Sequence, residues 1–236
     1  MAKDFIVAIE LGSSKITGIA GKKNPDGSIT VLSVAKEDSK ACMRKGVVYN
    51  IDKTAQALTN IINKLKGSLQ TDIARVYVGV GGQSLKGVKN VVVKDLPADS
   101  IVTQDIVNEL MDTNRNMKNN DYEVLDAITQ EYKVDMLDEL NPVGVQACHI
   151  EGNFLNLLWR KTFNRSLNKC FDNAGIPIVE MYVTPLAMAE EILTEAEKCA
   201  GCMLVDLGAD TTTVAIYTRD ILRHLFVLPL GSNNIT

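Results

Sequence analysis

The sequence has little of what several functional classes require. Its 236 residues include two histidines, one tryptophan and five irregularly spaced cysteines. Because the chain has two histidines, the sequence argues against a hydrolytic triad that uses histidine as its base. Cys199 and Cys202 form a single CxxC pair with no second pair nearby, which argues against a four-ligand zinc site. The cysteines form no regular disulfide framework, and this favours a reducing cytoplasm.

Long apolar runs and an excess of positive charge are absent as well. No run approaches the roughly 18–20 apolar residues that span a bilayer, and the apolar run at 5–9 is too short for a secretory signal. The formal net charge is −4, which argues against a nucleic-acid partner. The chain is 46% hydrophobic and 23% charged. We therefore expect a cytoplasmic globular protein that buries a substantial core.

Residue periodicity predicts a mixed α/β fold. Alternating or continuous apolar residues predict strands, at 5–11, 16–21, 28–35, 75–80, 91–94, 124–134, 145–158, 178–183, 202–207 and 213–217. Three-to-four spacing predicts helices at 52–66, 103–117 and 162–174, and a further helix from Thr184. Asp52 and Thr184 are expected to cap their helices, with Pro185 in the first position after Thr184. The change of pattern after Ser84 predicts a compact insert.

One strand-turn-strand pattern occurs twice, at 8–14 and at 204–210. Each copy combines an apolar strand, a carboxylate (Glu10 or Asp206), leucine, glycine and then small or polar residues. Glycine lets backbone approach a ligand, and successive N–H groups and hydroxyls can bond phosphate oxygens. A carboxylate at the strand end would hold Mg²⁺ through water. Two facing turns of this kind would bind the phosphates of one nucleotide; two ordinary hairpins with polar tips are the alternative.

The order and spacing of these motifs resemble the actin-like ATPase superfamily and, within it, the FtsA family of bacterial cell-division proteins. Residues 9–15 are similar to that family's first phosphate loop. Residues 205–208 with Thr211 and Thr212 are similar to its second. Further similar stretches cover essentially the whole chain, at 45–52, 76–82, 128–132, 141–144, 222–224 and 228–231.

The resemblance implies an α/β fold with an actin-like (ribonuclease H-like) first lobe, an inserted small α+β subdomain and the beginning of a second lobe. Subdomain 1A would comprise residues 1–83 plus 162–194. Residues 84–161 would form the inserted interaction subdomain 1C. Residues 195–236 would begin subdomain 2A, which would be incomplete.

The resemblance also implies ATP and Mg²⁺ as cofactors. The nucleotide-binding residues that it implies are Gly12, Ser13, Ser14, Lys15, Asp206, Gly208, Thr211, Thr212 and Gly231. Glu10 and Asp206 would hold Mg²⁺ through water. No catalytic residue is implied, so the chain would be at most a weak ATPase. Because the lobe that encloses base and ribose would lie outside this sequence, we expect weak or no ATP binding by these residues alone.

Three departures from the family pattern bear on this site. Glu10 stands where aspartate is usual, which moves the carboxylate outward by about one bond. Asp210 stands in a glycine run, where its charge opposes phosphate binding unless it points away or meets magnesium. Thr213 replaces a common aspartate. Together they argue against hydrolysis more than against the fold.

The implied function is that of a cell-division scaffold. Such a protein self-associates into filaments and links the tubulin-like protein FtsZ to the inner face of the cytoplasmic membrane through a C-terminal helix outside this sequence. Residues 84–161 would contact other division proteins. A PilM-like pilus-assembly protein is an alternative, since it shares the fold and an insert at the same place. A sugar or acetate kinase is a further one, against which Thr213 and the insert argue.

Overall fold

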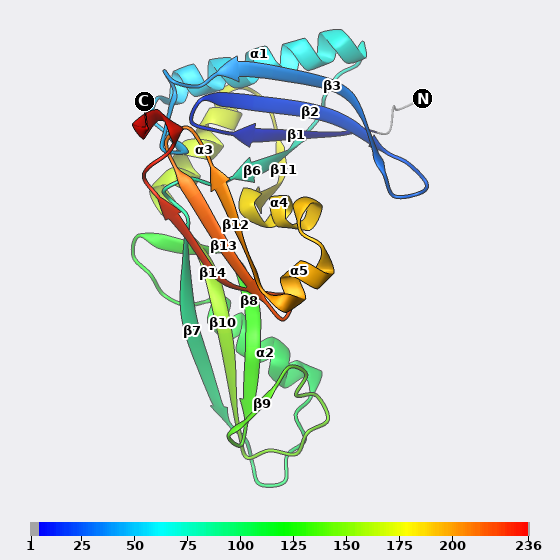
Figure 1. Cartoon of the computed structure of the whole chain (residues 1–236), viewed down its shortest axis with the longest axis vertical. Coiled ribbons are helices and arrows are strands. Elements are labelled where there is room, and N and C mark those ends of the chain that lie inside the picture. The colour runs from blue at the N-terminus through cyan, green and yellow to red at the C-terminus, as the bar shows by residue number, and fades with distance from the viewer. Residues whose placement is uncertain (1–4, 236) are drawn as a thin grey trace.

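The structure is a computed structural model that describes residues 5–235. Three larger β-sheets are arranged along its long axis (Figure 1), and a two-stranded sheet, β4-β5, accompanies them. Residues 1–4 and 236, which fall within the expected end subdomains, lie outside this description. The first sheet forms the first lobe. The second sheet stands off at the opposite end as the insert, and the third lies beside both (Figure 1).

The first-lobe sheet has the strand order β11-β6-β1-β2-β3. β1, β2 and β3 are antiparallel neighbours, whereas β6 runs parallel to β1 and β11 parallel to β6. This order is that of the predicted ribonuclease H-like lobe of the actin fold, and the predicted fold class is confirmed. The strands are β1 (Ile6–Leu11), β2 (Lys15–Lys23), β3 (Ile29–Asp38), β6 (Val76–Val80) and β11 (Ile178–Val183).

Two helices, α1 (Ile51–Leu69) and α3 (Lys161–Asn173), pack together over this sheet. Ile9, Leu58 and Leu167 meet in its core and are fully buried. α1 is capped by Asn50, whose side chain accepts from the Lys53 N–H at 3.0 Å. The predicted Asp52 cap is therefore wrong: Asp52 lies inside the first turn, where its charge favours the helix dipole.

The insert leaves the first lobe after β6 and returns at α3. Its sheet has the order β7-β10-β8-β9, and α2 (Gln104–Arg115) packs against it. The strands are β7 (Lys86–Asp95), β8 (Tyr122–Val134), β9 (Leu137–Glu139) and β10 (His149–Arg160). β7 is longer than predicted because lysines and Asn90 interrupt the apolar alternation; Asn90 lies on the face toward α2, where its amide donates to Asn114. β10 starts later than predicted because Val145 closes a turn, its N–H donating to Pro142 at 3.1 Å.

Two short helices lead from the first lobe to the third sheet. They are α4 (Thr184–Ile192) and α5 (Glu195–Ala200). Thr184 is already helical and Val183 occupies the cap position, so the predicted Thr184 cap is wrong. α5 was not predicted; Thr194 and Glu197 form a capping box at its start. No helix within residues 5–235 is both long enough and apolar enough to cross a membrane.

The third sheet, here called the second-lobe sheet, is the meander β12-β13-β14. Its strands are β12 (Cys202–Leu207), β13 (Thr212–Thr218) and β14 (Ile221–Leu228). Leu222 and Leu225 of β14 share a buried cluster with Leu155 and Leu157 of the insert. Arg223 also forms an ion pair with Glu131 at 2.6 Å. Apolar and charged contacts therefore join the second-lobe sheet to the insert.

Candidate functional site: a crevice between two matching turns

The two turns that the sequence pairs have the same geometry. The Gly12 N–H donates to the Lys15 carbonyl at 3.0 Å, and the Gly208 N–H donates to the Thr211 carbonyl at 2.9 Å. The flanking registers also correspond, because Glu10 lies opposite Thr17 on β2 and Asp206 lies opposite Thr213 on β13. Each hairpin therefore places a carboxylate and a threonine at equivalent positions beside its turn.

Each turn is braced from behind by its own lobe. The buried Ser39 hydroxyl donates to the Gly12 carbonyl at 2.7 Å. A 3₁₀ turn, η1 (Ser232–Asn234), performs the same role in the second lobe. There the Ser232 N–H donates to the Gly208 carbonyl and the Asn233 N–H to the Ala209 carbonyl, each at 2.9 Å. This bracing fixes the two turns before any ligand binds.

The turns line one crevice, with a volume of about 80 Å³. Six of the residues implied for nucleotide or magnesium meet there: Glu10, Gly12, Ser13, Asp206, Gly208 and Thr211. Within the described chain, further lining residues that were not assigned to the site are Leu11, Gly46, Gly81, Gly82, Thr184, Pro185, Ala209 and Thr213. The two distant stretches of sequence thus form opposite walls of one space.

The remaining implied residues lie beside the crevice without lining it. The Thr212 hydroxyl donates to the Leu230 carbonyl at 2.8 Å. A methyl group on Gly231 would lie 2.4 Å from the Ala209 carbonyl oxygen, so glycine is needed for close packing behind the second turn. Ser14 contributes its carbonyl, which accepts from the Ser39 N–H at 3.2 Å. Lys15 contributes positive charge, which lowers the pKa of Glu10.

Glu10 and Asp206 are two carboxylates in a partly desolvated space. Burial raises the pKa of Glu10, the nearby charge of Asp206 raises it further, and Lys15 partly offsets both. Burial also raises the pKa of Asp206. A bound divalent cation would lower the pKa of both carboxylates, because a nearby opposite charge favours the ionised form. Two carboxylates suit Mg²⁺, which keeps much of its water. Within residues 5–235 no cluster of three or more metal-binding side chains occurs.

At the two turns, several polar groups in the described part of the chain have no hydrogen-bond partner, and these groups suit phosphate and hydrated magnesium. Among the described residues, no acceptor is recorded for the backbone N–H groups of Ser13, Ser14, Ala209 and Asp210. The buried Thr17 hydroxyl, opposite Glu10, also has no partner there. Open N–H groups at both turns fit phosphate oxygens. An unpartnered hydroxyl next to the carboxylate fits a water of the magnesium shell.

One crevice residue, Gly46, comes from a hairpin that periodicity does not reveal. β4 (Met43–Arg44) and β5 (Val47–Val48) are joined by Lys45 and Gly46, both at positive φ. A methyl group on Gly46 would lie 2.5 Å from the Gly82 Cα, so the two glycines pack backbone against backbone. The Gly46 N–H donates to the Ser13 hydroxyl at 2.8 Å. The family-like stretch at 45–52 was the one signal that pointed here.

Asp210 does not line the crevice. It lines a larger cavity of about 480 Å³ at the outer side of the turns, together with Ser13, Lys40, Arg44, Lys45 and Asn233, among others. Its carboxylate accepts from the Lys45 N–H at 3.3 Å and from the Asn233 amide at 2.9 Å. The charge that seemed to oppose phosphate is thus directed toward two donors outside the crevice.

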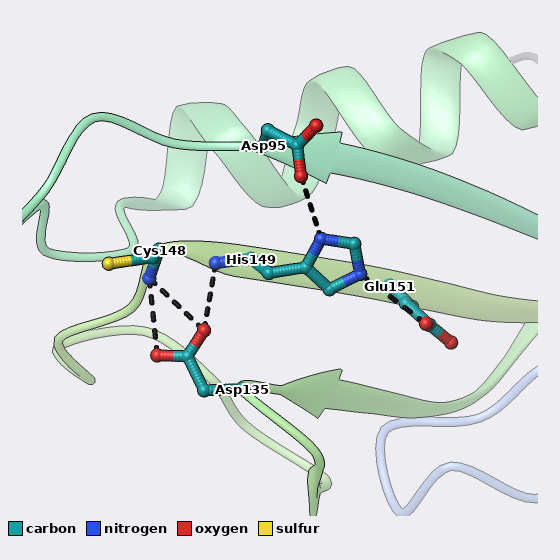
Figure 2. Close-up of polar contacts among 5 residues, drawn as sticks. All are labelled: Asp95, Asp135, Cys148, His149 and Glu151. Atoms are coloured by element: carbon teal, nitrogen blue, oxygen red, sulfur yellow. Dashed lines mark hydrogen bonds and ion pairs between the residues drawn. The ribbon is translucent and has the colours of Figure 1, made fainter.

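A second polar cluster lies at the far end of the insert (Figure 2). His149 Nδ1 contacts Asp95 at 2.8 Å, and Nε2 contacts Glu151 at 3.4 Å. These contacts raise the pKa of His149, the Asp95 hydrogen bond contributing most and the Glu151 bond next. Asp135 accepts from the backbone N–H groups of Cys148 and His149. The cluster ties β7, β8 and β10 together far from the crevice.

The sheet order, the insert and the paired turns together define an actin-like ATPase fold. The PilM–PilN type IV pilus biogenesis complex matches 97% of this chain and 62% of its own, with TM-score 0.63 and 14% identity. The ethanolamine utilization protein EutJ from Carboxydothermus hydrogenoformans matches 98% of this chain and 54% of its own, with TM-score 0.52 and 11% identity. At these identities the likeness shows the fold alone.

Comparison of sequences is more specific about the family than comparison of folds. Residues 82–158 match the family model described as the SHS2 domain inserted in FtsA. The cell division protein FtsA of Porphyromonas gingivalis is 33% identical over 97% of this chain and 48% of its own length. FtsA of Neisseria meningitidis is 28% identical over 98% and 56%, and FtsA of Escherichia coli 23% over 99% and 56%. The chain is an FtsA homologue, and it spans about half the length of these curated relatives.

Proposed function

We propose that this chain is the nucleotide-binding and insert-bearing part of an FtsA-like cell-division scaffold. The observation that carries the proposal is the match of residues 82–158 to the domain inserted in FtsA, at the point where the chain leaves the first lobe between β6 and α3. We propose the division into subdomain 1A (1–83 plus 162–194), insert 1C (84–161) and the start of 2A (195–236) on the same ground.

The crevice would hold the phosphates of ATP together with Mg²⁺. The open N–H groups at Ser13, Ser14, Ala209 and Asp210 would bond phosphate oxygens. Glu10 and Asp206 would hold the hydrated ion, which supplies positive charge between them and the phosphates. Gly12, Gly208 and Gly231 would let backbone approach closely. Lys15, Thr211 and Thr212 complete the proposed set around the two turns.

Binding rather than catalysis is the proposed role of the crevice. Thr213 lies opposite Asp206, at the position where the family has a common aspartate, and its side chain cannot act as a base. Glu10 is half-buried, and its raised pKa disfavours the charged form in the absence of a cation. We therefore assign no catalytic residue. The bound nucleotide would instead set the relation between the two lobes.

The insert would be the interaction module. Apolar side chains are exposed on it at Val91 and Val93 of β7, and at Met136, Leu137 and Leu140 near its tip; Met136 is 84% exposed. Scattered exposed apolar residues are common, but a group of them at one end fits a protein contact. The proposed partners are further copies of the protein, other division proteins, and FtsZ, at the cytoplasmic face of the membrane.

The experiment that tests this function is localisation and depletion of the gene product that contains this sequence. A fluorescent fusion should form a ring at mid-cell together with FtsZ, and depletion should give filamentous cells that lack septa. The PilM fold match favours a pilus-assembly role as the second candidate. Normal division with loss of pili after depletion would support that role and contradict the division scaffold.

A further inference from the structure

Five cationic side chains gather around one tyrosine where the insert joins the first lobe. Tyr122 begins β8, and the centre of its ring lies 3.7 Å from the Lys86 ammonium and 5.7 Å from the Arg160 guanidinium. The same tyrosine lines a cavity of about 430 Å³, to which three further cationic side chains contribute. The five side chains, here called the basal cluster, are Lys86, Arg115, Lys118, Arg160 and Lys161.

The positive charge of the basal cluster is not balanced by carboxylates. Within residues 5–235, no ion pair involves any of its five members. Glu123 also lines the cavity, but its carboxylate accepts from the Asn164 amide. Asp121 follows the lining residue Asn120, is exposed and takes part in none of these ion pairs. Like charges that are held together repel one another, and a bound anion would offset this repulsion.

The loop that forms one wall of the cavity also has free backbone donors. In the described part of the chain, the backbone N–H groups of residues 118–120 have no acceptor. The loop is nevertheless held in shape, because the Asn119 side chain accepts from the N–H groups of Asp121 and Tyr122 at 3.1 and 2.9 Å. The Lys161 ammonium also donates to the Asn119 carbonyl at 2.7 Å. Successive free N–H groups beside cationic side chains fit the oxygens of an anion.

The charge and size of the cavity indicate which anion it would bind. Three cationic side chains and one carboxylate line it, so a ligand with more than one negative charge fits better than a single carboxylate. A phosphate group has this charge and several acceptor oxygens, which suit the guanidinium of Arg115 and the ammonium of Lys118. The volume lies within the roughly 300–1,000 Å³ of small-molecule sites. A basic patch confined to one cavity, in a chain of net charge −4, does not fit a nucleic-acid backbone.

We propose that the basal cluster binds the phosphate group of a small ligand. The site is separate from the crevice, since the two share no lining residue, and it does not depend on the proposed nucleotide-binding function. A ligand there would contact the end of α2, the start of β8 and the start of α3 together, and so would hold the insert against the first lobe. A soluble phosphate compound and the headgroup of an anionic phospholipid both carry this chemistry, and separate probes distinguish them.

An NMR titration with inorganic pyrophosphate, without divalent cations, tests the soluble source. Pyrophosphate should shift the amide signals of residues 118–120 and raise Tm, because a ligand that binds the folded state stabilises it. Arg115→Gln and Lys118→Gln should each weaken binding about two- to fivefold, as expected for loss of one exposed charge contact. Lys169→Gln is the matched control, because it removes an exposed lysine of α3 outside the cavity and should leave binding unchanged.

Sedimentation with vesicles of phosphatidylglycerol and phosphatidylcholine tests the lipid source. Vesicle binding that Lys118→Gln weakens and Lys169→Gln does not would assign the site to a lipid headgroup. Pyrophosphate binding without vesicle binding would assign it to a soluble phosphate compound. Binding to neither probe, or equal weakening in the control, would overturn the site. Pyrophosphate shifts at 12–15 and 208–212 without shifts at 118–120 would count against the soluble source alone and leave the proposed nucleotide function intact.

Discussion

The negative charge of Asp206 raises the pKa of Glu10, although the two residues lie in hairpins near opposite ends of the chain. The two carboxylates face the same crevice, and burial raises the pKa of each. Nothing in the folding of either hairpin requires this pairing of like charges. The repulsion between the two carboxylates destabilises the folded protein, and a bound cation would remove it. This repulsion is the physical basis of the proposed magnesium site.

Replacing Glu10 by glutamine should stabilise the protein when magnesium is absent. Because the pKa of Glu10 is raised above its ordinary value of 4.5, its ionisation opposes folding as the pH rises through the raised pKa. At pH 7 removal of this charge should raise Tm by about 2–4 °C, equivalent to roughly 1 kcal/mol. Calorimetric melting without metal measures this. Glu37→Gln is the control, since Lys64 lowers the pKa of Glu37 and its loss should not stabilise.

The increase in Tm on addition of magnesium should differ between the same variants. Millimolar Mg²⁺ should raise Tm of the unmodified chain, because a ligand that binds the folded state stabilises it by mass action. Glu10→Gln and Asp206→Asn should each lose most of that increase, while Glu37→Gln should keep it. An equal increase in all four proteins would mean that the cation binds elsewhere.

The ion pair of Arg223 with Glu131 should hold the second-lobe sheet to the insert. Arg223 is largely buried, donates to Glu131 at 2.6 Å and contacts Gln130 at 3.3 Å. Arg223→Met should lower the free energy of unfolding by about 1 kcal/mol, since the pair is partly screened by solvent. A double-mutant cycle with Glu131→Gln measures the coupling, and Arg219→Met in the adjacent turn serves as control. A coupling of zero would show that the leucine cluster and the hydrogen bonds of Gln130 join the two sheets without help from this ion pair.

A buried asparagine pair should be essential to the insert. Asn114 of α2 and Asn156 of β10 are fully buried and exchange hydrogen bonds of 2.7 and 2.8 Å. Asn156→Leu should cost about 2–3 kcal/mol, because it leaves the Asn114 amide buried without this partner. Chemical denaturation provides the measurement. Asn108→Leu on the exposed side of α2 should cost little, and an equal loss in the two variants would refute the role of the pair.

The distal cluster should make the insert sensitive to pH. The pKa of His149 is raised by Asp95 and Glu151, so the stabilisation is complete below its ordinary pKa of 6.5 and is lost as pH rises through the raised value. Hydrogen exchange at the ends of β7 and β10 should therefore accelerate beyond the intrinsic chemical rate as the pH rises above 6.5. His149→Gln should abolish that excess. A pH dependence that persists in the variant would assign it to another group.

Much of the fold could be predicted because its strands are bounded by strong signals. β11 and β12 begin and end at their predicted residues, with Pro177 before one and Gly201 and Gly208 flanking the other. The β4–β5 hairpin was missed because two-residue strands carry no periodicity. Asn50 and Asp52 are both good capping residues, and only the backbone conformation shows which one caps α1.

The candidate site was predictable in its two turns and not in its surroundings. Gly12 and Gly208 repeat in a local pattern that the sequence displays directly. Gly46 and Gly82 reach the crevice only because their backbones pack on one another, which depends on the tertiary fold. The sequence likewise could not tell where Asp210 points, since its partners Lys45 and Asn233 come from both lobes.

The most direct test of the central claim is an NMR titration of the amide groups with magnesium tripolyphosphate, which carries the phosphates without the base and ribose. The account predicts weak, millimolar binding that shifts the amide signals of both turns, 12–15 and 208–212, with one common affinity. Glu10→Gln should weaken it. Shifts confined to one turn, or two different affinities, would contradict a shared phosphate-binding crevice.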